Sequence, residues 1–159
     1  MRQPKRLRSR AEKGSVAVET VLCLPLLLLF LAVPLFMARA FWYYSVAEKA
    51  AHDGARFLSN AAQHEIVATS GTGGQELPIA LLAKAIANAE MDEIKPALDW
   101  FSITAQCDGD DCGLAVPQSV RVSVRLRIRD EILGRFTSKI FGDGPLLLEA
   151  RVTMRYVGN

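Results

Sequence analysis

The feature that most constrains this chain is an uncharged, apolar segment of 19 residues that runs from Thr20 to Ala38. At 1.5 Å per residue, a helix over this segment is about 29 Å long, close to the roughly 30 Å hydrocarbon core of a bilayer. Pro25 and Pro34 lie inside it, but neighbouring helices in a bilayer can satisfy the backbone groups that a proline frees. The segment therefore predicts a membrane-spanning helix, which we place at residues 15–38.

Positive charge is concentrated before this segment. Residues 1–14 form a basic leader that holds six Lys or Arg against one Glu, a local charge of +5. Since the whole chain has a net charge of +2, residues 15–159 carry −3. The excess of basic residues predicts that the N-terminus stays in the cytoplasm and that the C-terminal part lies outside. The acidic remainder disfavours nucleic acid as a partner.

A cleavable secretory signal peptide is the main alternative for this segment. Such peptides have an apolar core of about 7–15 residues and then a small-residue cleavage site. Here the apolar run is longer, and it is followed by Trp42, Tyr43 and Tyr44, aromatic residues typical of the membrane–water interface. We therefore expect a retained anchor, with these three side chains at the interface.

A single acid, Glu19, directly precedes the uncharged run. A carboxylate at the centre of a bilayer costs roughly 2.5–3.5 kcal/mol on insertion scales, and less near the interface. Glu19 is therefore either an interfacial acid that reaches water or an acid that awaits a cationic partner. The residues alone leave both interpretations open.

The junction resembles the processing site of type IV prepilins. A short basic leader ends in Gly14, the new N-terminus would be Ser15, and Glu19 would be its fifth residue. The segments VETVLCLPL (18–26) and AAHDGAR (50–56) are similar to two stretches of the TadE-like family, minor pseudopilins of the tight-adherence (Tad, or Flp) pilus.

This resemblance covers roughly residues 10–60, with two departures from the family pattern. Thr20 stands where Phe or Ala is commoner, and His52 where Arg is usual. The resemblance implies a bacterial inner-membrane protein with a periplasmic C-terminal domain. Its implied partners are the lipid bilayer, a prepilin peptidase, other pilin or pseudopilin subunits and the pilus assembly platform.

The resemblance also implies cleavage between Gly14 and Ser15 by a membrane-embedded prepilin peptidase. The ammonium group of Ser15, on the same or a neighbouring subunit, would then neutralise Glu19 among apolar helices. Such a pair can specify axial register, because a slipped subunit would leave a charge unpaired.

Beyond the membrane, the helix is predicted to continue over residues 39–62 with a narrow stripe of small residues. The stripe consists of Ala40, Tyr44, Ala47, Ala51, Ala55, Leu58 and Ala62. It can pack on the chain's own domain or on other subunits, and we expect the first to contribute more. Residues 63–77 are predicted to be a glycine-rich linker with a flexible break at 70–74.

Residues 78–159 are predicted to form an exterior α+β domain. Its elements are a second helix from Pro78 to about Leu98 and three strands near 100–106, 119–129 and 148–156. Apolar and polar residues alternate in the last two strands, which predicts one buried face and one solvated face. Residues 141–145 have turn chemistry. The expected fold class is therefore α+β and pilin-like, with a long membrane-spanning helix, a second helix and a small antiparallel sheet.

Cys107 and Cys112 enclose a turn rich in Asp and Gly. In an oxidising exterior we favour a disulfide, which for so short a loop contributes about 2 kcal/mol, and reduced thiols are the alternative. Two thiols do not complete a zinc site, and the turn lacks the spacing of an EF-hand, so we expect no metal.

The sequence offers no catalytic constellation, since His52 and His64 have no Ser or Cys nucleophile arranged near them. The arginines of residues 119–129 could meet phosphate or an acidic partner, but we expect them to be the solvent face of a strand. We therefore predict a structural assembly protein rather than an enzyme, with no cofactor and no small-molecule substrate. The alternative is an uncleaved single-pass envelope protein whose exterior domain binds a partner.

Overall fold

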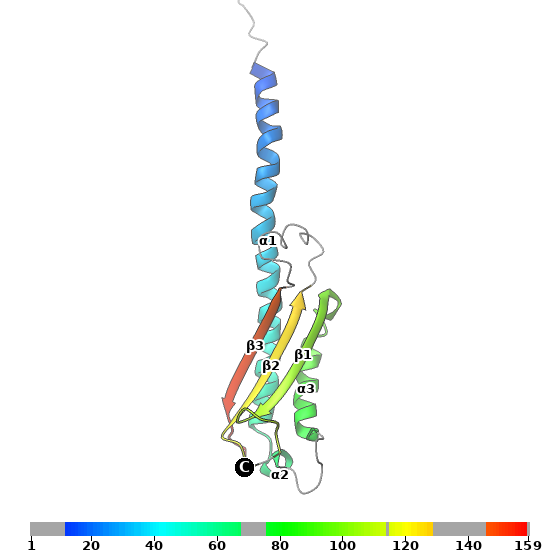
Figure 1. Cartoon of the computed structure of the whole chain (residues 1–159), viewed down its shortest axis with the longest axis vertical. Helices are drawn as coiled ribbons and strands as arrows, with labels where there is room; N and C mark the ends of the chain where they lie inside the picture. Colours follow the sequence, from blue (N-terminus) through cyan, green and yellow to red (C-terminus); the bar gives the residue numbers. More distant parts are fainter. Residues whose placement is uncertain (1–11, 68–75, 114, 129–145, 159) are drawn as a thin grey trace, which may run out of the picture. The chain divides into compact units, whose positions relative to one another are not determined.

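The computed structural model describes residues 12–67, 76–113, 115–128 and 146–158. Its elements are α1 (Glu12–Ser59), α2 (Gln63–Ile66), α3 (Pro78–Glu90), the 3₁₀ helix η1 (Lys95–Ala97), β1 (Leu98–Cys107), β2 (Ser119–Ile128) and β3 (Leu147–Arg155) (Figure 1). The chain divides into two compact units, Met1–Arg39 and Ala40–Asn159. Residues 1–11 of the predicted leader, the predicted break at 70–74 and the predicted turn at 141–145 lie outside the described residues, as does Arg129.

The first unit consists, where it is described, of the N-terminal part of α1. Its apolar side chains are exposed, including Leu22 at 75% and Phe30 at 72%. The most apolar 18-residue window has a mean hydropathy of 2.7 and no part of it is buried. Both Pro25 and Pro34 lie inside the helix. The predicted long, apolar N-terminal helix is confirmed, and it fits a single-pass membrane protein.

The second unit is built around a three-stranded antiparallel sheet in the order β1-β2-β3. The register places Val124 of β2 opposite Ile103 of β1 and opposite Ala150 of β3. The predicted alternation in β2 is correct, because the apolar residues at even positions from 120 to 128 are all buried. The α+β fold class is therefore confirmed.

The α1 residues of the second unit bury a stripe of small side chains in the core. Ala47, Ala51, Ala55 and Leu58 are all fully buried, so this part of the predicted stripe packs on the chain's own domain. A Cβ atom added to Gly54 would lie 3.1 Å from the carbonyl oxygen of Ala83 and 3.4 Å from Cγ1 of Val122. Gly54 therefore marks where α1 passes closely between α3 and the sheet.

Two members of the predicted stripe, Tyr44 and Ala62, are wrong. Ala62 lies beyond the end of α1 at Ser59 and is half-buried, so the helix predicted over residues 39–62 ends three residues early. Tyr43, not Tyr44, lies on the buried face, with 2% of its surface exposed against 39% for Tyr44. The physical reason is that Tyr43, Ala47 and Ala50 follow the helical spacing of one face. Tyr43 is thus a core residue rather than an interfacial aromatic, whereas Trp42 and Tyr44 remain exposed.

The helix predicted to end near Leu98 ends earlier. The α3 helix stops at Glu90, where the backbone N–H groups of Met91 and Asp92 bond to carbonyls only three residues back. Pro96 disfavours helical geometry in the residue before it, and the chain then turns into β1 at Leu98. The segment predicted to be a linker also begins with a short helix, α2.

Candidate functional site

The predicted cleavage residues lie at the start of α1. The helix begins at Glu12, so the backbone of both Gly14 and Ser15 belongs to its first two turns. Glu19 follows Ser15 by four residues, a spacing that places two positions on the same side of a helix. The structure therefore presents the residues of the processing motif in consecutive turns of one helix.

Glu19 is exposed, and it makes no ion pair with any residue that the structure describes. It borders a shallow depression of about 260 Å³ along one side of α1, whose other lining residues are Thr20, Cys23, Leu24 and Leu27. Between Ala17 and Ala38 it is the only charged residue. One carboxylate thus marks an otherwise apolar helix surface.

The apolar surface of α1 is not covered by any described residue of the first unit. Large apolar side chains are exposed from Val18 to Leu35. A contiguous apolar surface of this extent is not stable in water and is typical of a segment covered by lipid or by other helices. The described part of the chain has one helix long and apolar enough to cross a membrane.

The turn that contains the two exterior cysteines is tightly built. Asp108 and Gly109 have φ angles of 52° and 99°, and Cys107 and Asp110 exchange two backbone hydrogen bonds of 2.7 and 3.1 Å. This is the geometry of a type I′ hairpin turn, for which Asp-Gly is a favoured pair. A disulfide joins Cys107 to Cys112, whose Cα atoms lie 4.8 Å apart.

The carboxylate of Asp108 is used inside this turn. It accepts hydrogen bonds from the backbone N–H groups of Gln118 and Ser119, each at 2.8 Å, and from the Ser119 hydroxyl at 3.0 Å. These bonds, the one from Gln118 first, lower the pKa of Asp108 below its usual value. Asp108 therefore holds the loop between β1 and β2 in place.

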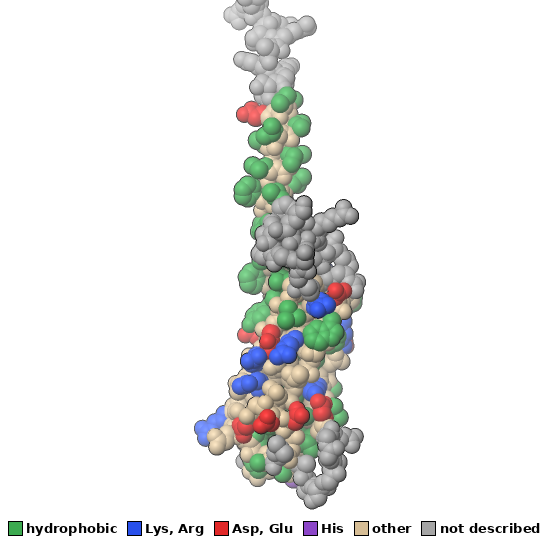
Figure 2. Space-filling view, in the orientation of Figure 1, with side chains coloured by type: hydrophobic (Ala, Val, Ile, Leu, Met, Phe, Trp, Pro, Cys, Tyr) green, Lys and Arg blue, Asp and Glu red, His purple; other side chains and the backbone are tan. Residues whose placement is uncertain are grey.

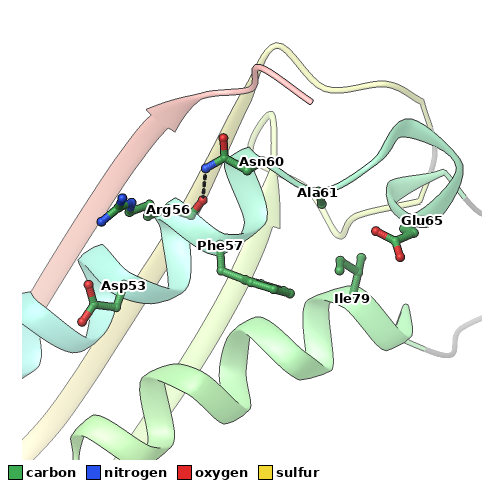
Figure 3. A pocket seen from close by; sticks show the side chains of 7 residues that line it. All are labelled: Asp53, Arg56, Phe57, Asn60, Ala61, Glu65 and Ile79. Carbon is green, nitrogen blue, oxygen red and sulfur yellow. Dashed lines mark hydrogen bonds between the residues drawn. The ribbon is translucent and has the colours of Figure 1, made fainter. Parts of the chain in front are cut away.

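A surface depression of about 410 Å³ lies where α1, α2 and α3 meet (Figure 3). It is lined by Asp53, Arg56, Phe57, Asn60, Ala61, Glu65 and Ile79. Phe57 points towards Ile79, while Asp53 and Arg56 point away from it (Figure 3). Asn60 Nδ2 donates to the carbonyl of Arg56 at 2.7 Å. The lining mixes both charges around an apolar floor and brings together no nucleophile with a base.

The C-terminal end of β3 is fastened to the end of α1 by contacts that the sequence pattern does not reveal. The Tyr156 hydroxyl donates to the carbonyl of Ala61 at 2.7 Å, and the Val157 N–H donates to the carbonyl of Ser59 at 3.0 Å. Burial, and secondarily Glu65, raises the pKa of Tyr156. Gly158 packs against the same two groups, Ala61 and Tyr156. These residues close the second unit at the end opposite Ala40.

Comparison with known families matches residues 14–56 to the family described as TadE-like protein. The match contains the junction, the apolar helix and the start of the second unit, and it confirms the resemblance over this segment. No curated protein and no solved structure matches the chain. Within the match, the small residues of the AAHDGAR segment include Ala51, Gly54 and Ala55, which pack on the core.

Proposed function

We propose, from the match of residues 14–56 to the TadE-like family, that this chain is a minor pseudopilin that takes part in assembling a Tad/Flp pilus. The match by itself suggests a Tad pilus-associated protein. Our proposal adds that a prepilin peptidase removes the basic leader, and that the protein acts as a structural subunit rather than as an enzyme.

The observation that carries this proposal is the junction at the start of an exposed apolar helix. Gly14 and Ser15 lie in α1, and Glu19 follows in the next turn. Cleavage between Gly14 and Ser15 would remove a segment of charge +5 and create an α-amino group, which is positively charged at neutral pH. The exposed carboxylate of Glu19 would thus gain a positively charged group, the new α-amino group of Ser15, with which it can pair.

Glu19 suits a contact between subunits. Its carboxylate is exposed and makes no ion pair within the described residues. Among apolar helices an unpaired carboxylate is costly, so a packing arrangement that brings a neighbouring Ser15 ammonium to Glu19 is favoured over a slipped one. We propose that this pair sets the axial register of the subunit.

The two units differ in which surface of α1 is left exposed to other molecules. The small-residue stripe of α1 beyond Ala40 is buried in the second unit, so it is occupied by the chain's own domain. The apolar surface before Arg39 is exposed and free to contact lipid or other pilin subunits. We place the N-terminus in the cytoplasm, the apolar segment in the bacterial inner membrane and the second unit in the periplasm.

A deletion and complementation experiment tests this role. Deleting the gene should abolish pili, counted as fibres per cell by electron microscopy, and the wild-type gene should restore them. Gly14→Val should fail to restore them because it alters the residue before the cut. Ala17→Val, which places the same side chain at an exposed position of α1, is the matched control and should restore them. Normal pili in the deletion strain would overturn the proposal, and restoration by Gly14→Val would favour an uncleaved envelope protein.

A further inference from the structure

The outer face of the sheet, which points away from the core, is strongly basic. Five arginines project from it, and together with the one acid among them we call this set the arginine face: Arg121, Arg125 and Arg127 of β2, and Glu149, Arg151 and Arg155 of β3. All but Arg121 are exposed. Figure 2 shows basic side chains gathered over the strands. The row of arginines expected on β2 alone is therefore extended by the arginines of β3 into a wider basic surface.

The arginine face and the rest of residues 15–159 have net charges of opposite sign. The arginine face carries +4, and because residues 15–159 carry −3 in total, the remainder of that segment carries −7. Opposite charges on one chain, gathered on different surfaces, favour contact between copies, since complementary potentials steer and orient association. The basic face is therefore matched by an acidic surplus elsewhere on the same protein.

The arginine face is not neutralised from within. Glu149 Oε1 is shared by Arg125 Nε at 3.3 Å and Arg151 Nη2 at 2.6 Å. These two arginines, Arg151 first, lower the pKa of Glu149. Neither Arg127 nor Arg155 makes an ion pair with a residue of the described chain. The one carboxylate of the arginine face thus contacts two of its five guanidinium groups, and guanidinium groups are well suited to paired contacts with further carboxylates.

The chain also displays carboxylates on a rigid support. Asp110 and Asp111, which we call the acidic turn, are exposed, and within the described residues neither makes an ion pair. The type I′ turn and the Cys107–Cys112 disulfide hold them in place. In Figure 2 acidic side chains gather at the end of the sheet where β1 leads into β2.

The acidic turn cannot reach most of the arginine face of its own chain. It follows Cys107, which pairs with Val120 at the start of β2, whereas Arg125 lies six residues beyond Ser119, about 20 Å along the strand. Arg127 is further still. Arg125 and Arg127 are therefore separated from the acidic turn on one molecule but available to the acidic turn of a second, whereas Arg121 and Arg155 lie at the same end of the sheet as that turn.

We propose that the arginine face binds the acidic turn of a second copy of this chain. Arg125 and Arg127 would donate paired hydrogen bonds to the carboxylates of Asp110 and Asp111. Both surfaces lie on regular or disulfide-closed backbone, so little conformational entropy is lost on contact. The contact does not depend on leader cleavage, and it goes beyond the membrane helix packing proposed above.

Two charge-reversed proteins test this contact in the full-length chain. The first carries Arg125→Glu and Arg127→Glu, and the second carries Asp110→Lys and Asp111→Lys. Förster transfer between differently labelled copies in detergent micelles measures self-association. Each variant alone should bind itself at least about 10-fold more weakly than wild type does. A mixture of the two should recover binding, because each copy then offers a surface complementary to the other.

Matched controls separate this contact from association through α1. Arg56→Glu and Glu48→Lys each make one charge reversal of the same kinds at exposed α1 positions, half the charge change of the corresponding double variant, and should leave the transfer signal unchanged. Raising the salt concentration should weaken wild-type binding. If the arginine variant fails to fold, the neutral variant Arg127→Gln replaces it, and if the acidic-turn variant fails to fold, Asp111→Asn replaces it; either neutral variant should weaken self-association.

Three results would overturn the proposal. They are no self-association of the wild type, equal association of wild type and reversed variants, or no recovery in the mixture. Binding of the wild type to phosphatidylglycerol vesicles that is lost in the arginine variant, with self-association unchanged, would assign the arginine face to a lipid surface instead. None of these results bears on leader cleavage or on pilus formation in cells, so the proposed function is tested separately.

Discussion

Gly54 offers the sharpest test of how α1 packs in the second unit. Replacing it with Ala adds one methyl group that meets Ala87 Cβ and Val122 Cγ1 at 3.4 Å, which is ordinary contact, and the Ala83 carbonyl oxygen at 3.1 Å, which is tight. Ala is favoured over Gly inside a helix by about 1 kcal/mol. The gain and the tight contact oppose each other, so Gly54→Ala should change the free energy of unfolding by less than about 1 kcal/mol.

A larger side chain removes that balance. Gly54→Leu places further atoms between α1, α3 and β2, and overpacking of a close-packed core typically costs about 1–3 kcal/mol, occasionally more. We expect Gly54→Leu to lower the free energy of unfolding by about 2–3 kcal/mol after the helix-propensity gain. Urea unfolding of the full-length chain in detergent, followed by circular dichroism, measures the difference.

The matched control is His52→Leu, which puts the same side chain two residues earlier on an exposed side of α1. It should leave the unfolding free energy within about 0.5 kcal/mol of wild type. Equal effects of Leu at positions 52 and 54, or a Gly54→Ala variant as unstable as Gly54→Leu, would refute the close crossing of α1.

Three further predictions concern Gly158 at the C-terminal end, Asp108 in the loop between β1 and β2, and Glu19 in α1. Gly158→Ala should destabilise the protein in urea more than Gly54→Ala does, because its Cβ would lie 2.0 Å from the Ala61 carbonyl oxygen and 2.3 Å from the Tyr156 hydroxyl; equal stability would contradict this. The lowered pKa of Asp108 stabilises the fold above the usual Asp pKa of about 3.9, and this stabilisation is lost as the pH falls through the lower folded value. Asp108→Asn should therefore reduce the loss of melting temperature between pH 7 and pH 2.5, and an unchanged acid profile would count against it. Glu19→Ala should block pilus assembly while leader cleavage stays normal, and intact assembly would rule out its role in register.

Local patterns in the sequence predict the elements whose burial depends on neighbours a few residues away. The alternation of β2 predicts its buried face because each side chain's direction follows from the strand alone. The apolar run before Arg39 likewise predicts a long helix, because its length and composition are local properties of the sequence. The choice between Tyr43 and Tyr44, by contrast, depends on which side of α1 meets the sheet, because both residues stand at helical spacing from Ala47.

The ends of elements were harder to predict than their existence. The α3 helix ends at Glu90 because the chain must return to begin β1, a requirement set by the tertiary fold. The start of α2 has a local signal that was missed: Glu65 accepts a hydrogen bond from the Ala62 N–H at 3.3 Å. The bond between Tyr156 and Ala61 joins residues 95 positions apart, which no local pattern reveals.

The candidate site was predicted mainly from the order of residues at the junction. Gly14, Ser15 and Glu19 form a motif of fixed spacing, and the family match includes all three. Processing at Gly14 stays a prediction that rests on this motif. The sequence predicted only the β2 arginines of the arginine face. The register of β2 against β3, which lets Arg125 and Arg151 share Glu149, comes from the tertiary fold.

The most direct test is the intact mass and N-terminal sequence of the protein purified from its own cells, with active prepilin peptidase. The proposed function predicts a chain that begins at Ser15 and has lost the mass of residues 1–14. In cells that lack the peptidase the same protein should keep Met1 and the whole leader. A full-length chain in cells with active peptidase would contradict the central claim and favour an uncleaved, single-pass envelope protein.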